Sequence, residues 1–582
     1  MFIGRESELQ YLNDAYRSDK AEFIVLYGRR RVGKTELLNE FCKDKTAIFY
    51  TCREYTDAKQ LQSFTDKVHS YNIPAFEYVD CFSGWEKAFS AVLHVPTSGK
   101  KLLIIDEFPY ACKVNESIPS ILQVLWDEKL RHENVMIILC GSAMSFIEKE
   151  LLAEKNPLYG RTTGIYKMKP LPYTDAIRFF PNYSDEDKLL AYAILGGIPH
   201  YLSQFDRNLS LEQNVKRNIL RKGCALYNEV EFLLKQELRE TAVYNTIVEA
   251  IALGCNSFSE ILSKTQLEKS KLSVYLKNLI EISIVEKESP ALASDKEKNS
   301  STKGNYILTD NFFRFWYAFA YRNLTDLEND DIDGVWESNI VKSLHDFASQ
   351  PFEKVCLEYL YLLNREKKLP FRIHNASRYW GKTMRTIDGK KQSVNLEIDI
   401  LAPDTKKKSF IFGECKFRDE AFDMQQFRNL QGKVFVDGAI WFYLFSLSGF
   451  TEAVSAYAEN HDHVILVTID QYDCDIVLST ISSFEYEDKV VHISPIISAE
   501  DEKNIKSKCF EIISHPELQK QGFYSLIDID NILFDIRFRL LLGKTEGHTH
   551  TVAFHFHYGL AVLINQFQLA FILHDSPPSS PR

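Results

Sequence analysis

A glycine-rich loop that directly follows an apolar run constrains this chain more than any other feature. The run FIVLYG occupies positions 23–28, and GRRRVGKT spans Gly28–Thr35. Gly28 and Gly33 allow the backbone to fold closely around a phosphate with its N–H groups pointing inward. A strand that enters the loop and a helix that begins near Lys34 would add the helix dipole to phosphate binding. The pattern predicts a phosphate-binding loop (P-loop).

The residue types in this loop predict that the phosphate belongs to ATP, bound together with Mg²⁺. Lys34 supplies a positive charge for the β- and γ-phosphates, and Thr35 supplies a hydroxyl ligand for the cation. We expect the whole loop to contact the nucleotide, and its residues are Gly28, Arg29, Arg30, Arg31, Val32, Gly33, Lys34 and Thr35.

A second motif, LLIIDEF at positions 102–108, supports the same chemistry. Asp106 ends the apolar run, where it can hold the water shell of Mg²⁺, and Glu107 can polarise the attacking water. Burying two carboxylates without a cation is costly, so this pair indicates function rather than packing. We therefore predict Mg²⁺-dependent ATP hydrolysis.

Short apolar runs alternate with helical stretches through residues 1–205. FIVLYG, LLIID and VMIILCG (135–141) lack polar alternation, as strands do when helices cover both faces of a parallel sheet. A helical pattern at 117–130 separates the last two runs. We predict an α/β ATPase domain with a parallel sheet over 1–205.

Composition limits the remaining possibilities. The chain has 582 residues, too many for one hydrophobic core, and a formal net charge of −11, so any contact with nucleic acid needs a local basic patch. Its 11 cysteines include no CxxC pair, which argues against a zinc ribbon or a disulfide framework. The N-terminus has no signal pattern, and polar residues interrupt the apolar stretch 559–573. We expect a cytoplasmic protein of several domains, without a membrane span.

The motifs of the first 205 residues resemble those of AAA+-like ATPases of the archaeal and bacterial type, which are related to the STAND signalling ATPases. The resemblance implies that FIGRESEL (2–9) packs near the adenine and that Ser142, in LCGSAMS, reads the γ-phosphate. It also makes Arg161, which ends PLYGR, a candidate to approach the γ-phosphate, the alternative being a surface arginine. Gly197 and Pro199, in GGIPHYL, are similar to the glycine–proline motif of the STAND helical subdomain. The catalytic set implied in this way is Lys34, Glu107, Ser142 and Arg161.

Residues 206–330 are expected to form a helical linker and a winged helix-turn-helix. Tyr244–Leu253 has helical periodicity, and the SxxE spacing of Ser257 to Glu260 resembles a capping box. A third helix, within 268–287, runs into a strand, and the wing would comprise strands around Ile284 and Tyr306 with a polar insert between them. The aromatic segment 311–322 is expected to pack in the core.

This middle region could bind double-stranded DNA or another protein. Five residues lie on or near the expected recognition helix: Lys269, Ser270, Lys271, Ser273 and Lys277. Neighbouring glutamates, such as Glu268 and Glu281, dilute their positive charge, and many winged helices bind proteins instead. Both interpretations stay open.

Residues 345–470 contain a second group of charged side chains. LEIDIL (396–401) alternates, so Glu397 and Asp399 share one strand face. FIFGECKF (410–417) puts Glu414 and Lys416 on one face of the next strand. These side chains can converge, the alternative being a plain salt bridge between Glu414 and Lys416.

The arrangement resembles the PD-(D/E)XK nuclease constellation, in which carboxylates bind Mg²⁺ and a lysine lies beside the attacking water. A helix at Pro351–Leu363 offers Glu353 as a further ligand. RYWG (378–381) and GECKF are also similar to the nuclease-like module that follows this type of ATPase. Such modules are often retained for binding alone, so cleavage stays open. The metal site implied comprises Glu353, Asp399 and Glu414, with Lys416.

Residues 475–582 fit no pattern, and their end, HDSPPSSPR, has a disordered composition. Four histidines here, His548, His550, His555 and His557, are expected to be incidental rather than a zinc site. The fold class predicted is multidomain α/β: a parallel-sheet P-loop ATPase core, a helical winged-helix middle domain and an α/β nuclease-like (restriction-endonuclease-type) domain. Two functions fit it: an ATPase that couples nucleotide state to DNA binding or processing, or a STAND-like switch with a nucleotide-dependent homo-oligomer or a protein partner.

Overall fold

The computed structural model describes residues 2–298, 300, 304–387 and 390–469, and five short strands beyond them. The chain divides into two compact units, Met1–Thr468 and Ile469–Arg582. In the second unit two strands pair as a hairpin, β13 (Glu485–Tyr486) with β14 (Lys489–Val490). Three more form an antiparallel sheet: β15 (Ala553–His555), β16 (Leu560–Asn565) and β17 (Gln568–Leu573). The side chains of the four tail histidines lie outside the described residues.

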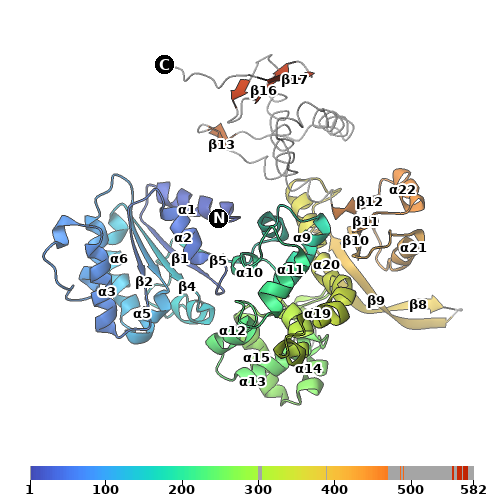
Figure 1. The fold of residues 1–582 in the computed structure, drawn as a ribbon, viewed down its shortest axis with the longest axis horizontal. Helices are drawn as coiled ribbons and strands as arrows, with labels where there is room; N and C mark the ends of the chain where they lie inside the picture. Colours follow the sequence, from blue (N-terminus) through green and yellow to red (C-terminus); the bar gives the residue numbers. More distant parts are fainter. Residues whose placement is uncertain are drawn as a thin grey trace. The chain divides into compact units, whose positions relative to one another are not determined.

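The first 170 residues form a five-stranded sheet in the order β2-β3-β4-β1-β5, with every pair parallel. Its strands are β1 (Glu22–Gly28), β2 (Ala47–Thr51), β3 (Lys101–Asp106), β4 (Val135–Gly141) and β5 (Gly164–Met168). Helices cover both faces (Figure 1): α1 (Glu6–Arg17), α2 (Lys34–Cys42), α3 (Asp57–His69), α4 (Trp85–Ser90), α5 (Phe108–Val114), α6 (Ile118–Glu128) and the short α7 (Met144–Phe146). The predicted parallel sheet is confirmed.

Burial explains why these strands show no polar alternation. All seven residues of β4 are buried, and six of the seven residues of β1. Phe23, Val25 and Tyr27 belong to one core cluster together with Phe64 of α3 and Trp85 of α4. The inner strands β1 and β4 therefore carry apolar side chains on both faces, as a sheet between two helical layers requires, whereas the edge strand β5 is partly exposed.

Helices dominate the next part of the chain. A first group comprises α8 (Tyr173–Ala176), α9 (Asp185–Leu195), α10 (Pro199–Leu202), α11 (Leu211–Val215) and α12 (Glu229–Glu237). Three helices and an antiparallel hairpin follow: α13 (Thr241–Ala252), α14 (Phe258–Thr265), α15 (Lys269–Glu281), β6 (Val285–Glu288) and β7 (Asn305–Leu308), with α16 (Asp295–Lys298) between the two strands. The capping box is confirmed, because Ser257 Oγ accepts from the Glu260 N–H and Glu260 accepts from the Ser257 N–H.

The aromatic segment after β7 packs in the core, as predicted. It forms α17 (Asn311–Phe315) and the turns that precede α18 (Leu324–Glu328) and α19 (Ile332–Val335). Phe312, Phe313 and Trp316 are at most 1% exposed. The Trp316 indole Nε1 donates to the Tyr227 carbonyl at 2.8 Å, so its one polar atom is satisfied within the core.

The helix predicted at Pro351–Leu363 is longer in the structure, where α20 spans Leu344–Arg365 with Pro351 inside it. A proline has no N–H to donate to the carbonyl four residues earlier. Here that carbonyl belongs to Phe347, and it accepts from Arg314 Nη2 at 2.6 Å. A side chain distant in sequence thus replaces the missing helical hydrogen bond, and the helix continues.

A second five-stranded sheet, in the order β12-β11-β10-β9-β8, follows α20. Its elements are β8 (Ser377–Ile387), β9 (Lys390–Pro403), β10 (Ser409–Lys416), α21 (Met424–Gly432), β11 (Ala439–Ser446), α22 (Glu452–Glu459) and β12 (Val464–Thr468). The pairs β8–β9 and β9–β10 are antiparallel, whereas β10–β11 and β11–β12 are parallel. Within the described ranges, none of the helices has the length and apolarity that crossing a membrane requires.

Candidate functional site

The glycine-rich loop lies between β1 and α2, at the carboxyl end of the parallel strands. Gly33 has φ +88° and is the residue before α2, a left-handed conformation that favours glycine. The Lys34 ammonium donates to the carbonyls of Gly28 at 3.0 Å and Arg29 at 3.1 Å. Burial lowers the pKa of Lys34. The loop therefore holds a nearly buried cation against its own carbonyl oxygens.

The end of β3 brings the second motif to the same place. Thr35 Oγ1 donates to Asp106 Oδ2 at 2.8 Å, and Asp106 is 1% exposed. A hydroxyl and a carboxylate oxygen in contact are the hard oxygen donors that Mg²⁺ prefers, so these two residues fit the cation predicted here.

The end of β4, the strand between β3 and β1, adds a third polar group. Ser142 Oγ donates to Glu107 Oε2 at 3.0 Å. Glu107 has φ +51° and ψ 40°, a left-handed conformation that costs a non-glycine residue about 1–2 kcal/mol. This conformation lies at the start of α5, where it places the carboxylate beside Ser142. Lys34, Thr35, Asp106, Glu107 and Ser142 are thus gathered at one edge of the sheet.

Arg161 is not part of this group. Its Nε donates to Asp127 Oδ2 at 2.8 Å and its Nη1 donates to the Pro157 carbonyl at 2.8 Å, so the guanidinium is engaged locally in this structure. Two motifs given by resemblance do reach the loop. Arg5 of FIGRESEL donates to the Val32 carbonyl at 2.9 Å, and a Cβ on Gly33 would lie 3.7 Å from Pro199 Cγ.

The three arginines of the loop each pair with a carboxylate from the helical region. Arg29 Nη1 lies 2.5 Å from Asp310 Oδ2, and the guanidinium carbon lies 5.1 Å from the centre of the Phe313 ring. The side chains of Arg29 and Asp310 are 8% and 1% exposed. This ion pair is buried and joins residues 281 positions apart in the sequence.

The other two arginines reach the two ends of α12. Arg30 Nε lies 2.6 Å from Glu237 Oε1, and Arg31 forms an ion pair with Glu229, whose side chain is 1% exposed. Tyr201 donates its hydroxyl to Glu229 at 3.2 Å. Burial raises the pKa of Glu229 to about 7, even though Arg31 opposes that shift.

The second group of predicted residues converges at the junction of β9 and β10. Asp399 accepts from the Cys415 N–H at 2.9 Å, and Glu414 receives Lys416 at 2.6 Å and Lys433, just after α21, at 2.8 Å. Burial acts to raise the pKa of Glu414, but the two lysines outweigh it, so its pKa is lowered. The salt bridge between Glu414 and Lys416, which the sequence offered as the alternative to a metal site, is present. Lys433 is an addition that the sequence motif did not indicate.

Glu353 of α20 lies near Asp399. The two carboxylates line a small pocket together with Glu288 of β6 and Arg378 of β8. Burial, followed by the charge of Asp399, raises the pKa of Glu353 to about 8. The pKa of Asp399 is raised as well, by burial and then by Glu414. Close carboxylates that resist ionisation fit a divalent cation, so the predicted Mg²⁺ site is chemically consistent with this pocket.

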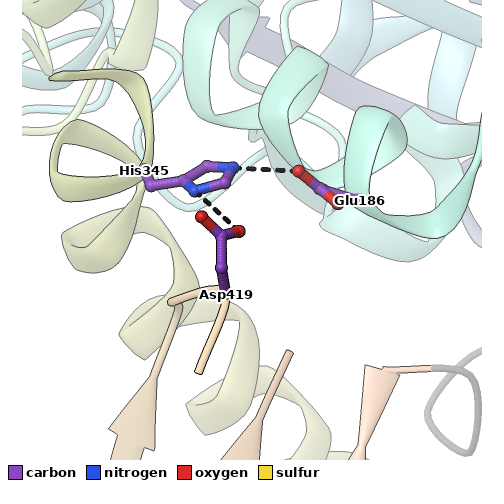
Figure 2. Close-up of side chains that lie close together, drawn as sticks. All are labelled: Glu186, His345 and Asp419. Carbon is purple, nitrogen blue, oxygen red and sulfur yellow. Dashed lines mark hydrogen bonds and ion pairs between the residues drawn. The ribbon is translucent and has the colours of Figure 1, made fainter. Parts of the chain in front are cut away.

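A further cluster links three distant segments (Figure 2). His345 of α20 lies between two carboxylates, with Nε2 2.9 Å from Glu186 of α9 and Nδ1 3.2 Å from Asp419 after β10. The two ring nitrogens contact different carboxylates, so the imidazole bridges Glu186 and Asp419.

Sequence reasoning did not find Asp310, Glu229, Glu288, Lys433 or His345. None of them lies in a short motif, and each acquires its partner only through tertiary contacts. The one signal was the run of three arginines in the loop, because buried cations require carboxylates.

Comparison with known proteins places two families on the chain. Residues 2–205 match an ATPase domain found predominantly in Archaea. Residues 316–428 match a family of archaeal and bacterial proteins of unknown function. The second match contains all four residues of the predicted nuclease-like site.

Relatives and solved structures were found as well. An uncharacterized protein of Methanocaldococcus jannaschii is 34% identical over 420 residues, covering 72% of this chain and 88% of the relative. An ATP-binding protein of the same organism is 49% identical over 45 residues, covering 8% of this chain and 76% of that protein. The Walker-type ATPase of Pyrococcus abyssi is 21% identical, with a TM-score of 0.43, over 54% of this chain and 96% of that one. The ORC2 protein of Aeropyrum pernix is 12% identical, with a TM-score of 0.34, over 57% and 95%.

Proposed function

Since this chain belongs to the family of the 34%-identical M. jannaschii protein and carries the ATPase domain found predominantly in Archaea, we propose that it binds and hydrolyses ATP with Mg²⁺ at the loop Gly28–Thr35. One observation carries the proposal. The hydroxyl of Thr35, the carboxylate of Asp106 and the Glu107–Ser142 pair meet beside the Lys34 ammonium, at the edge where a phosphate-binding loop opens.

Each residue has a role that follows from its position. Lys34 attracts the β- and γ-phosphates, and Thr35 and Asp106 would hold the cation, which neutralises charge on the transferred phosphoryl group. Glu107 orients and deprotonates the attacking water, and Ser142 fixes the Glu107 carboxylate by a hydrogen bond. Arg161 would act only if it left Asp127.

The test is phosphate release by the full chain with Mg²⁺ and ATP. We expect Glu107→Gln to retain nucleotide binding and to lose turnover by about 100-fold or more, because it keeps the shape but not the base. Glu116→Gln, an exposed glutamate close by in sequence, serves as the control. Unchanged turnover in Glu107→Gln would remove the assigned base.

We propose that ATP binding controls how the regions after the ATPase domain bind or process DNA. The three helices and hairpin of residues 241–308 provide the elements of a winged helix, with Lys269, Lys271 and Lys277 on α15 as DNA contacts. The site of Glu353, Asp399, Glu414 and Lys416 would then cut or grip the DNA with Mg²⁺. Supercoiled DNA with Mg²⁺ is the substrate to use: Asp399→Asn abolishes nicking, whereas exposed Glu420→Gln does not.

The second candidate is a cytoplasmic STAND-like switch whose nuclease-like domain does not cleave. The buried ion pairs between the loop arginines and the helical region favour it, because they link the nucleotide site to the rest of the chain without DNA. The two candidates differ in ATP turnover with and without DNA. Stimulation by DNA supports processing, whereas a nucleotide-dependent change of assembly state without DNA stimulation supports the switch.

A further inference from the structure

The phosphate-binding loop is held by side chains that come from about 200 and 280 residues later in the sequence. We call the ion pairs Arg29–Asp310 and Arg31–Glu229 the loop clamp. Both carboxylates are 1% exposed, and Arg29 is 8% exposed, so solvent does little to weaken the Arg29–Asp310 pair. Arg31 is 29% exposed, so solvent reaches the second pair from the arginine side only. The clamp is therefore part of the folded core around the loop rather than a surface contact.

Asp310 is a rigid partner. Its Oδ1 accepts from the N–H groups of Phe312 at 2.8 Å and Phe313 at 3.2 Å, which caps α17, and its Oδ2 receives Arg29. The position of the Arg29 guanidinium is thus set by the backbone of α17. The Phe313 ring beneath it fixes the plane of the guanidinium further.

The clamp acts on atoms that hold the catalytic lysine. Arg29 contributes its guanidinium to the clamp and its carbonyl oxygen to Lys34 Nζ, so one residue links the two contacts. Arg31, two residues on, has φ +70°, a left-handed conformation that an arginine adopts only where its surroundings hold it. Its guanidinium is held by Glu229.

We propose that Asp310 and Glu229 are positioning residues of the nucleotide site, which set the shape of the loop and the place of Lys34 so that the loop is ready to receive phosphates. The inference rests on the proposed function. Three arginines drawn onto carboxylates also leave Lys34 as the loop cation that faces the phosphates. The ATPase domain alone is then incomplete, and its nucleotide affinity depends on the helical region.

Coupling between two parts of a molecule is reciprocal. If the clamp prepares the loop for nucleotide, nucleotide must in turn stabilise the clamp. We therefore expect α12 and α17 to become harder to open when the loop is occupied, because the clamp connects both helices to the loop. That gives two independent measurements.

The first measurement is the dissociation constant of a fluorescent ADP analogue for the full chain. The variant is Arg29→Ala with Asp310→Asn, which removes both charges together and keeps an oxygen to cap α17. We expect its dissociation constant to rise about tenfold while its unfolding temperature stays near that of the unmodified chain. Glu328→Gln, which alters a carboxylate of the same region bonded to Tyr227, is the matched control and should bind normally.

The outcomes are distinguishable. Binding by the double variant within twofold of the unmodified chain overturns the clamp and leaves the proposed function intact. No binding by the unmodified chain removes the proposed function and the clamp with it. Should the double variant fail to fold, hydrogen exchange on the unmodified chain decides: added ADP slows exchange in 229–237 and 311–315, and unchanged exchange there in a chain that binds ADP refutes the clamp.

Discussion

The nucleotide site and the carboxylate pocket of the second sheet use the same residue types in opposite ways. At the first, Lys34 donates hydrogen bonds to carbonyl oxygens. A phosphate can replace these oxygens as the partner of Lys34, because they carry no net charge. At the second, Lys416 and Lys433 are already paired with Glu414, and Glu353 and Asp399 are left crowded together. This contrast is the basis for proposing an anion at the first site and a cation at the second.

The largest effect expected from this contrast is the loss of ATP turnover in Lys34→Ala, by about 1000-fold, because the three loop arginines are paired with carboxylates and Lys34 is the loop side chain left to face the phosphates. Glu414→Ala should leave basal turnover unchanged, since Glu414 lies on the second sheet and pairs with Lys416 of the same strand and with Lys433 just after α21. Phosphate release by both variants checks the pair. A collapse of turnover in Glu414→Ala would show that the two sites are not separate.

Glu353 should make the second site sensitive to pH. Its pKa in the folded chain is about 8, above the ordinary value of 4.5, so the folded state holds the proton more tightly than the unfolded state. Stability from this group is full below about pH 4.5 and declines as pH rises toward 8. We expect Glu353→Gln to gain several degrees in the unfolding temperature relative to the unmodified chain at pH 8.5, and little at pH 5. An equal shift at both pH values would contradict the raised pKa.

Glu229 should make nucleotide binding at the first site depend on pH. The affinity should fall as the pH falls, by a modest factor. With its pKa at about 7, this carboxylate is ionised above that pH and pairs fully with Arg31, within reach of the charges of Arg29 and Asp310 and of the Tyr201 hydroxyl. Lowering the pH from 8 to 6 should weaken nucleotide binding about threefold. Glu229→Gln should bind about as weakly at both pH values, and titration with the ADP analogue measures the difference.

Arg30 marks the limit of the clamp. Arg30 is 29% exposed, as Arg31 is, but its partner Glu237 is 18% exposed whereas Glu229 and Asp310 are 1% exposed, so solvent screens this pair more than the two clamp pairs. We expect Glu237→Gln to change nucleotide affinity by about twofold or less. An effect as large as that of the double variant would mean that the third arginine shapes the loop as well.

Much of the fold could be predicted from the sequence because its signals are local. Apolar runs gave β1, β3 and β4 within a residue at each end, since strands buried on both faces need unbroken apolar sequence. The contact of Thr35 with Asp106 was within reach for a related reason: Thr35 lies in the first turn of the helix that follows β1, and Asp106 ends β3 of the same parallel sheet. Asp399, Glu414 and Lys416 were found from alternation along two paired strands.

What sequence reasoning missed depends on contacts between distant segments. The sequence around Asp310 is that of an ordinary helix cap. Its pairing with Arg29 becomes evident only in the tertiary structure. The interior proline of α20 is a similar case. Local rules place Pro351 at the start of a helix, as the predicted range 351–363 did, and the contact of Arg314 with the Phe347 carbonyl explains how the helix can begin earlier.

That contact also determines where the chain can be divided. A fragment that began at residue 345, where the sequence suggests a domain start, would keep Pro351 and lose Arg314, so the Phe347 carbonyl would have neither partner. The fragment would also lose Phe315 and Phe319, whose rings pack against the ring of Phe347. Anyone expressing the second sheet separately should therefore begin upstream of α17, near residue 305, so that the helix travels with the residues that complete it.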